Sequence, residues 1–108
     1  MYLGNFDSFR FTAASDISCN TIIKAGGMVG VTKANTLSGE TGLAFLGVPV
    51  SVYSFTVSAL AAAKDQGAAV YLTSDGAIAF ATAEGSVQIG VLWEAAASGA
   101  TEIKVALR

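Results

Sequence analysis

The stretch that decides the fold is the C-terminal segment Val87–Arg108, VQIGVLWEAAASGATEIKVALR. In its last seven residues the odd positions are apolar and three of the four even positions are charged. This period of two is typical of a half-buried β-strand. The part 87–93 alternates in the same way, and Ala-Ser-Gly-Ala at 97–100 has turn chemistry. The segment therefore predicts two strands joined by a short connection.

Similar alternation recurs upstream, where Phe9 and Phe11 alternate with Ser, Arg and Thr, and apolar residues alternate through 70–73 and 78–80. Between the last two lies Asp75-Gly76, a dipeptide that strongly favours a β-hairpin. Short strands separated by such turns predict an all-β chain, a small β-barrel or sandwich.

One segment suggests a helix instead. Residues 57–66 are alanine-rich, Val57, Leu60 and Lys64 have helical spacing, and Gly67 follows as a possible terminator. We therefore expect one short helix or helical turn around residues 57–66, crossing one end of the barrel. It would be about two turns long and stable only if packed.

The length of 108 residues predicts a single domain. We divide it into an N-terminal arm, residues 1–8, and a β-barrel-like domain, residues 9–108. The arm carries Tyr2, Leu3 and Phe6, so it has much apolar surface for a terminus. Two interpretations stay open: the arm folds back onto its own barrel, or it docks on a neighbouring subunit with its aromatic side chains as anchors.

The segment 43–52 is apolar on both faces of a predicted strand. Leu43 and Phe45 point one way, and Ala44, Leu46 and Val48 point the other. Such a strand is covered on both sides, either by the chain's own loop or helix or by another subunit. Pro49 lacks an amide hydrogen, so the strand ladder must break, bulge or lie at an edge there. From the arm and this strand we take five candidate interface residues: Tyr2, Leu3, Phe6, Leu46 and Val48.

The composition points to burial by partners. Charged residues make up only 13% of the chain and apolar residues 53%, against a usual charged share of about 25%. The net charge is −2 without a basic cluster, which argues against nucleic-acid binding. Residues 41–63 carry no charge, but their glycines, serines and Pro49 and their strand-like alternation argue against a membrane helix.

The sequence offers little chemistry. It has no histidine, so a hydrolytic triad is excluded, and no D-x-D-x-D-G loop for a metal ion. The glycine-rich run GGMVGVTK (26–33) lacks the Gly-Lys pair of a phosphate-binding loop and predicts a turn into a strand. The single cysteine, Cys19, has no histidine to activate it. We expect no enzyme activity, cofactor, metal or small-molecule substrate.

From about Asp7 to Arg108 the chain resembles the small capsid decoration (cement) proteins of tailed bacteriophages and prophages. The resemblance rests mainly on residues 67–108, with Gly then Val-Tyr, a turn, Ile-Gly-Val followed by Glu-Ala, and a final alternating strand. Ala68 and Ala69 depart from it, since an acidic residue and a proline often precede Val-Tyr in that family.

The resemblance implies a structural protein of the virion exterior, made in the bacterial host cytoplasm. It also implies that the major capsid protein is its partner and that it forms a homotrimer. It supplies no catalytic residues. The alternative is a small ligand- or carbohydrate-binding barrel that uses Trp93 or the tyrosines Tyr2, Tyr53 and Tyr71.

Overall fold

The computed structural model describes residues 1–107, and all regular structure in this range is β. The all-β prediction is therefore confirmed. The strands are β1 (Tyr2–Thr12), β2 (Ile22–Ala25), β3 (Met28–Thr32), β4 (Thr41–Thr56), β5 (Ala69–Leu72), β6 (Ile78–Ala79), β7 (Val87–Leu92) and β8 (Glu102–Leu107).

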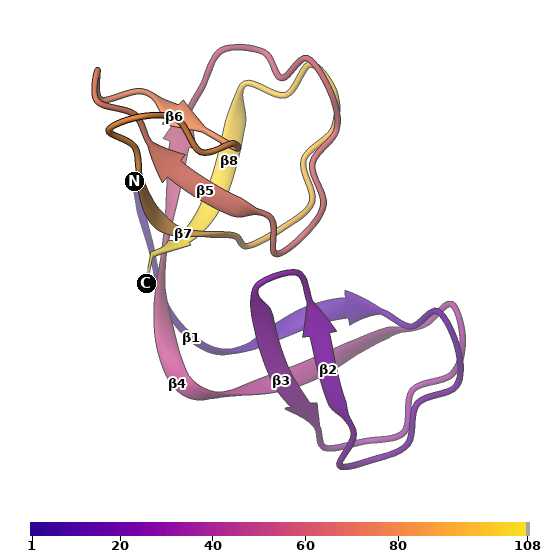
Figure 1. The fold of residues 1–108 in the computed structure, drawn as a ribbon. Coiled ribbons are helices and arrows are strands. Elements are labelled where there is room, and N and C mark those ends of the chain that lie inside the picture. Colours follow the sequence, from indigo (N-terminus) through magenta and orange to yellow (C-terminus); the bar gives the residue numbers. More distant parts are fainter. Residues whose placement is uncertain (108) are drawn as a thin grey trace.

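The strands form one antiparallel sheet in the order β2-β3-β4-β8-β7-β5-β6, and β1 pairs with β4 off this path. The long strand β4 runs through both parts of the molecule (Figure 1). One of its edges is paired with β1, and the other is paired first with β3 and later with β8. Strands β2 and β3 thus lie at one end of the molecule and β5 to β8 at the other, while β1, like β4, runs through both parts (Figure 1).

The backbone of β4 bends sharply between its two parts (Figure 1). Phe6 pairs with Val50 and Ser8 pairs with Phe45, so residues 46–49 have no partner in the β1 ladder. The predicted interruption at Pro49 is therefore confirmed. We call residues 46–50 the elbow.

The two ends of the molecule are built on the same plan. Backbone bridges join Ile17 to Thr36 and Lys64 to Ala96 at corresponding places. Three backbone hydrogen bonds at one end have counterparts at the other. The bond from Gly39 N to Ala13 O corresponds to that from Gly99 N to Leu60 O, and the bond from Asn20 N to Thr32 O corresponds to that from Gly67 N to Leu92 O. The bond from Glu40 N to Leu37 O corresponds to that from Ala100 N to Ala97 O. We therefore describe a first repeat, residues 13–45, and a second repeat, residues 60–106.

The strands match as well. In the first repeat β2 pairs with β3 and β3 with β4; in the second β5 pairs with β7 and β7 with β8. The two-residue turn Gly26-Gly27 of the first repeat is replaced in the second by residues 73–86, which include β6. The left-handed residue Asn20 (φ 63°) corresponds to Gly67 (φ 84°).

The helix expected around residues 57–66 is absent, and this prediction was wrong. The segment runs as an extended loop beside residues 96–101. The amides of Val57, Leu60 and Lys64 donate to carbonyl groups of that neighbouring loop, at 2.8, 3.0 and 2.8 Å. Val57 and Leu60 also pack on the core of the second repeat. The helical spacing thus reflects contacts with another loop rather than hydrogen bonds within a helix. Among residues 1–107, no helix has the length and hydropathy needed to cross a bilayer.

Two apolar clusters form the core. One lies under the first repeat and includes Phe9, Phe11 and Met28, together with Val91 and Trp93 of the second repeat. The other lies within the second repeat around Val70, Leu92, Ile103 and Val105.

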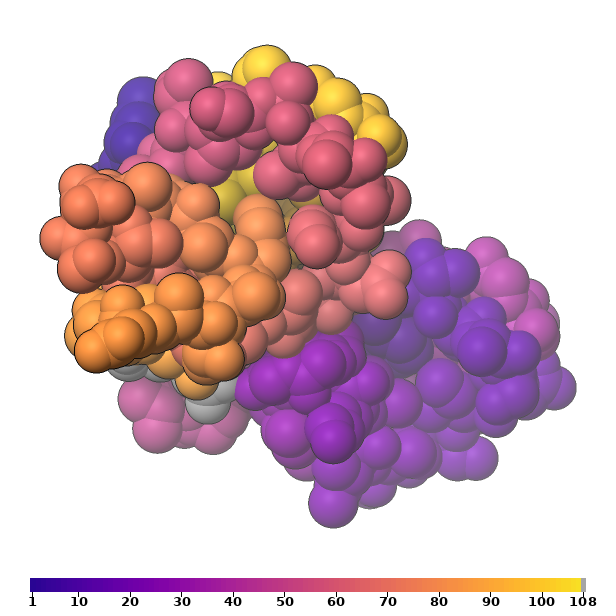
Figure 2. Space-filling view, turned by 45° about the horizontal axis from the view of Figure 1, so that its top comes forward, coloured from indigo at the N-terminus to yellow at the C-terminus, as the bar shows by residue number. Residues whose placement is uncertain are grey.

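The Gly26-Gly27 turn of the first repeat packs closely against Gly67 of the second repeat. The amide of Gly27 donates to the carbonyl of Gly67 at 2.8 Å. A Cβ on Gly67 would lie 1.7 Å from the carbonyl oxygen of Ala25, so no other residue fits there without a shift. Figure 2 shows the two ends as separate lobes that meet along this junction.

Candidate interaction surface

The N-terminal arm is the first part of β1 and folds back onto β4. The Met1 ammonium donates to the carbonyl of Ser54 at 2.6 Å, and the Ser54 amide donates to the carbonyl of Met1 at 2.7 Å. The rings of Tyr2 and Tyr53 lie 5.2 Å apart. These are the contacts expected if the arm folds back onto its own domain, which is the first of the two interpretations. Whether Tyr2 also contacts a partner stays a prediction.

The five candidate interface residues do not form one patch. Leu3 and Leu46 are half-buried and pack against the core of the first repeat. Tyr2 and Phe6 are exposed on β1, and Val48 is 75% exposed at the elbow. The structure therefore leaves Tyr2, Phe6 and Val48 as the accessible members of this set.

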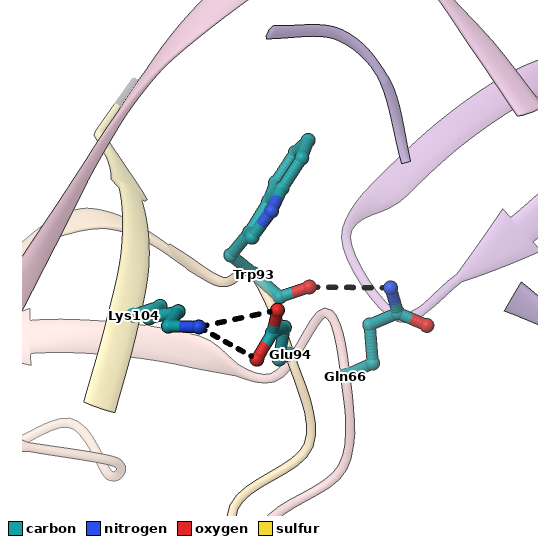
Figure 3. A network of polar contacts seen from close by, with 4 residues as sticks. All are labelled: Gln66, Trp93, Glu94 and Lys104. Carbon is teal, nitrogen blue, oxygen red and sulfur yellow. Dashed lines mark hydrogen bonds and ion pairs between the residues drawn. The ribbon is translucent and has the colours of Figure 1, made fainter. Parts of the chain in front are cut away.

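A cleft of about 470 Å³ lies beside Trp93, where the two repeats meet. The Gln66 side-chain amide donates to the carbonyl groups of Arg10 (2.7 Å) and Trp93 (3.2 Å), which ties β1 to the second repeat. Beside it, the Lys104 ammonium lies 3.2 Å from the Glu94 carboxylate (Figure 3). Both side chains of this ion pair are exposed, so it contributes little to stability.

The cleft does not suit carbohydrate or hydrolytic chemistry. Trp93 is only 9% exposed, and its ring lies 5.4 Å from the ring of Phe6, so it offers little free surface for stacking. Trp93 therefore belongs to the core. Glu94 is the one carboxylate in the lining of the cleft, and it is paired with Lys104. No observation here favours the carbohydrate-binding alternative.

Elsewhere in residues 1–107, no group of three or more potential metal ligands comes together. Cys19 is exposed.

The second hollow, of about 390 Å³, lies at the elbow. Its lining is almost wholly apolar and comes from the elbow, β3 and the ends of β7 and β8. Val48 and Pro49 form one wall, and Val29 and Leu107 contribute from the neighbouring strands. The hollow at the elbow therefore offers no polar side chain that could orient a small ligand, and its polar surface comes from backbone groups.

Exposed apolar side chains are concentrated in the first part of the chain. In the described range, residues 1–107, eleven large apolar residues are exposed, and nine of them precede residue 49. The five candidate interface residues include only Tyr2, Phe6 and Val48 of these nine, and those that sequence reasoning missed include Ile22, Val29 and Val31. The signal was present in β3, where Met28, Gly30 and Thr32 alternate with the two valines. Ile22 and Val31 are paired across β2 and β3, so they lie side by side, and grouped exposed apolar side chains mark an interaction site in a soluble protein.

Three comparisons bear on identity. A family model described as phage cement protein matches residues 4–107. Searches of curated proteins and of solved structures returned no match. The match spans nearly the whole chain, including both repeats, the elbow and the junction cleft. The chain therefore belongs to the phage cement protein family.

Proposed function

We propose that this protein binds the outside of an assembled phage capsid, through the major capsid protein, and stabilises the shell. The observation that carries the proposal is the concentration of exposed apolar side chains before residue 49. It occurs on a chain that belongs to the cement family and has few charges to solvate its surface. The protein would be made in the bacterial host cytoplasm and would act on the virion exterior.

The mechanism is thermodynamic linkage. A protein that binds the assembled shell, but not its dissociated subunits, stabilises the shell by RT ln(1 + [L]/Kd) per site. This amounts to about 2.7 kcal/mol per site when the free protein is at a hundredfold excess over Kd. Because a shell carries many copies, sites of modest affinity sum to a large effect.

We also propose that the protein acts as a homotrimer. A closed ring of three copies would contact several capsid subunits at once, and the resulting avidity would exceed the affinity of one copy. Sedimentation-velocity analysis of the free protein measures this directly, and a purely monomeric protein at all concentrations would contradict it.

The binding proposal is tested by co-sedimentation. Shells assembled from the major capsid protein of the same phage, without decoration protein, are mixed with increasing amounts of purified protein and pelleted. We expect saturable binding with a fixed ratio of the two chains. Unassembled capsid protein is the matched control and should bind much more weakly. Absence of saturable binding to shells would contradict the proposal.

A further inference from the structure

The sheet of the first repeat has an outer face that is apolar where a solvent-facing sheet would be polar. Strand register places Ile22 opposite Val31, and Val31 opposite Phe45, so these three side chains form one row across β2, β3 and β4. Ile22 is 71% exposed and Val31 is 39% exposed. We call the outward side chains of β2, β3, residues 41–45 of β4 and residues 8–12 of β1 the outer face.

Cations flank this apolar row on both sides, in the neighbouring rows of the sheet. Lys24 is paired with Val29 on one side, and Arg10 is paired with Leu43 on the other. The Lys33 ammonium lies 4.3 Å from the centre of the Phe45 ring. These are three of the six cationic residues of the chain, and the outward strand positions of the face include no carboxylate.

The second repeat has the same face, but there it is covered. The row equivalent to Ile22, Val31 and Phe45 consists of Ala69, Val91 and Ala106, which are paired in the same order. Val91 and Ala106 belong to the core cluster that also contains Phe9 and Met28. The inner face of the first repeat thus packs on the outer face of the second.

The first repeat is therefore an end repeat with an unprotected face. In proteins built from stacked repeats, an end repeat needs a polar outer surface to remain soluble. Here the position of the small, half-buried Ala69 of the second repeat is taken in the first repeat by the larger Ile22, which is exposed. A larger apolar side chain at an exposed site indicates that another surface covers it.

A second copy of this chain does not supply that surface. If two copies met through the same outer face, Arg10, Lys24 and Lys33 of both copies would enter one interface whose strand positions supply no carboxylate, and like charges brought together are unfavourable. The surfaces that cover such a face within the chain are inner faces, and both are already occupied. That of the first repeat packs on the second, and that of the second packs against Ile78, Phe80 and residues 57–60.

We propose that the outer face binds a different protein, at a surface that is apolar in its centre and acidic at its rim. Resting on the proposed function, this partner is the major capsid protein. The apolar row would supply the buried centre of the contact, while the surrounding cations would steer association and set its orientation. A contact of this kind weakens as salt concentration rises.

The test compares shell binding by two variants of the outer face with two control variants, which carry the same kind of substitution in the second repeat. The apolar variant is Ile22→Ser with Val31→Ser, and its control is Val87→Ser, at an exposed position on β7. The charge variant is Lys24→Glu with Lys33→Glu, and its control is Lys64→Glu in the second repeat. Affinity for undecorated shells is measured at low and high salt, and melting temperature and sedimentation velocity are measured for each free protein.

We expect each outer-face variant to lower shell affinity at least tenfold, about 1.4 kcal/mol, and to melt close to the unchanged protein. Each control should bind within about twofold. The charge variant should also show a smaller salt dependence. If all variants bind shells equally, the inference is wrong and the proposed function stands. If the unchanged protein does not bind shells, the proposed function fails as well. If the apolar variant instead reduces the oligomeric state of the free protein, a second copy covers the face and the inference is overturned.

Discussion

Val31 and Val91 occupy the same position in two repeats of one chain, yet Val31 is 39% exposed and Val91 is 2% exposed. Each is paired with the next strand of its own repeat, Val31 with Phe45 and Val91 with Ala106. The difference arises because the first repeat packs on the second, while no part of residues 1–107 packs on the outer face of the first. The exposed fraction of valine at this position therefore distinguishes the covered outer face of the second repeat from the uncovered outer face of the first.

The two valines give a matched pair for stability. Val91→Ala removes buried methyl groups from a packed core and should lower the free energy of unfolding by about 2 kcal/mol. Val31→Ala changes an exposed site and should alter it by no more than about 0.5 kcal/mol. Urea unfolding of both variants measures the difference. Equal losses would mean that the first repeat does not cover the second as described.

Gly67 should be the most sensitive glycine of the junction. It has a positive φ of 84°, and a Cβ there would overlap the backbone of Ala25. Gly99 has the same φ of 84°, but a Cβ there meets nothing within 4 Å. Gly99→Ala should therefore cost only the backbone strain, about 1–2 kcal/mol. Gly67→Ala adds the steric overlap and should lower the free energy of unfolding by clearly more. Chemical denaturation of both variants measures the two losses. Similar losses would contradict the tight contact between the repeats.

Phe6 should control the environment of the only tryptophan. The Phe6 ring lies 5.4 Å from the ring of Trp93. Tyr2, at the start of the same strand β1, instead contacts the ring of Tyr53 on β4. Phe6→Ala should therefore admit water to Trp93 and shift its fluorescence emission to longer wavelength. Tyr2→Ala, the control, should leave the emission maximum unchanged. A red shift in both variants would indicate that the whole start of β1 has detached.

Deletion of residues 1–6 separates the two roles considered for the arm. The deletion removes the paired bonds between Met1 and Ser54 and uncovers Trp93. We expect a lower melting temperature for the free protein, because the arm contributes strand pairing and packing. If the melting temperature is unchanged and only shell occupancy falls, the arm acts chiefly at an interface between proteins.

Local patterns in the sequence predicted the strands well. Alternation identified the second half of β1 and the strands β5, β7 and β8, whereas the first half of β1 was expected to be an arm. The paired glycines at 26–27 form the predicted turn, and Pro49 marks the interruption of β4. These features depend on neighbouring residues and on the chemistry of single residue types. The family resemblance rested on the same patterns, and the family match confirms it.

Features that depend on distant contacts were not predicted. The spacing of Val57, Leu60 and Lys64 imitates a helix, but their amides bond to another loop. Thr32 is fully buried although it is polar, because its hydroxyl donates to the carbonyl of Ser18 at 2.9 Å and accepts from the amide of Thr21 at 3.0 Å.

The outer face was missed for a related reason. In β3, Gly30 and Thr32 occupy the buried positions, so Val29 and Val31 must lie on the exposed side of the strand. Hydrophobicity alone does not predict this arrangement. The repeat could have been noticed from Val29-Gly30-Val31 followed by Ser38-Gly39, and Ile89-Gly90-Val91 followed by Ser98-Gly99. The long replacement of the Gly26-Gly27 turn by residues 73–86 obscures this match.

The central claim, that the protein stabilises a capsid, is tested most directly by the melting temperature of the shell itself. Undecorated shells are heated in a calorimeter with increasing concentrations of the protein, and with the Ile22→Ser, Val31→Ser variant as the matched control. We predict that the melting temperature of the shell rises with protein concentration, as linkage requires, and that the variant needs a higher concentration for the same rise. A shell melting temperature that is unchanged at saturating occupancy would contradict the claim.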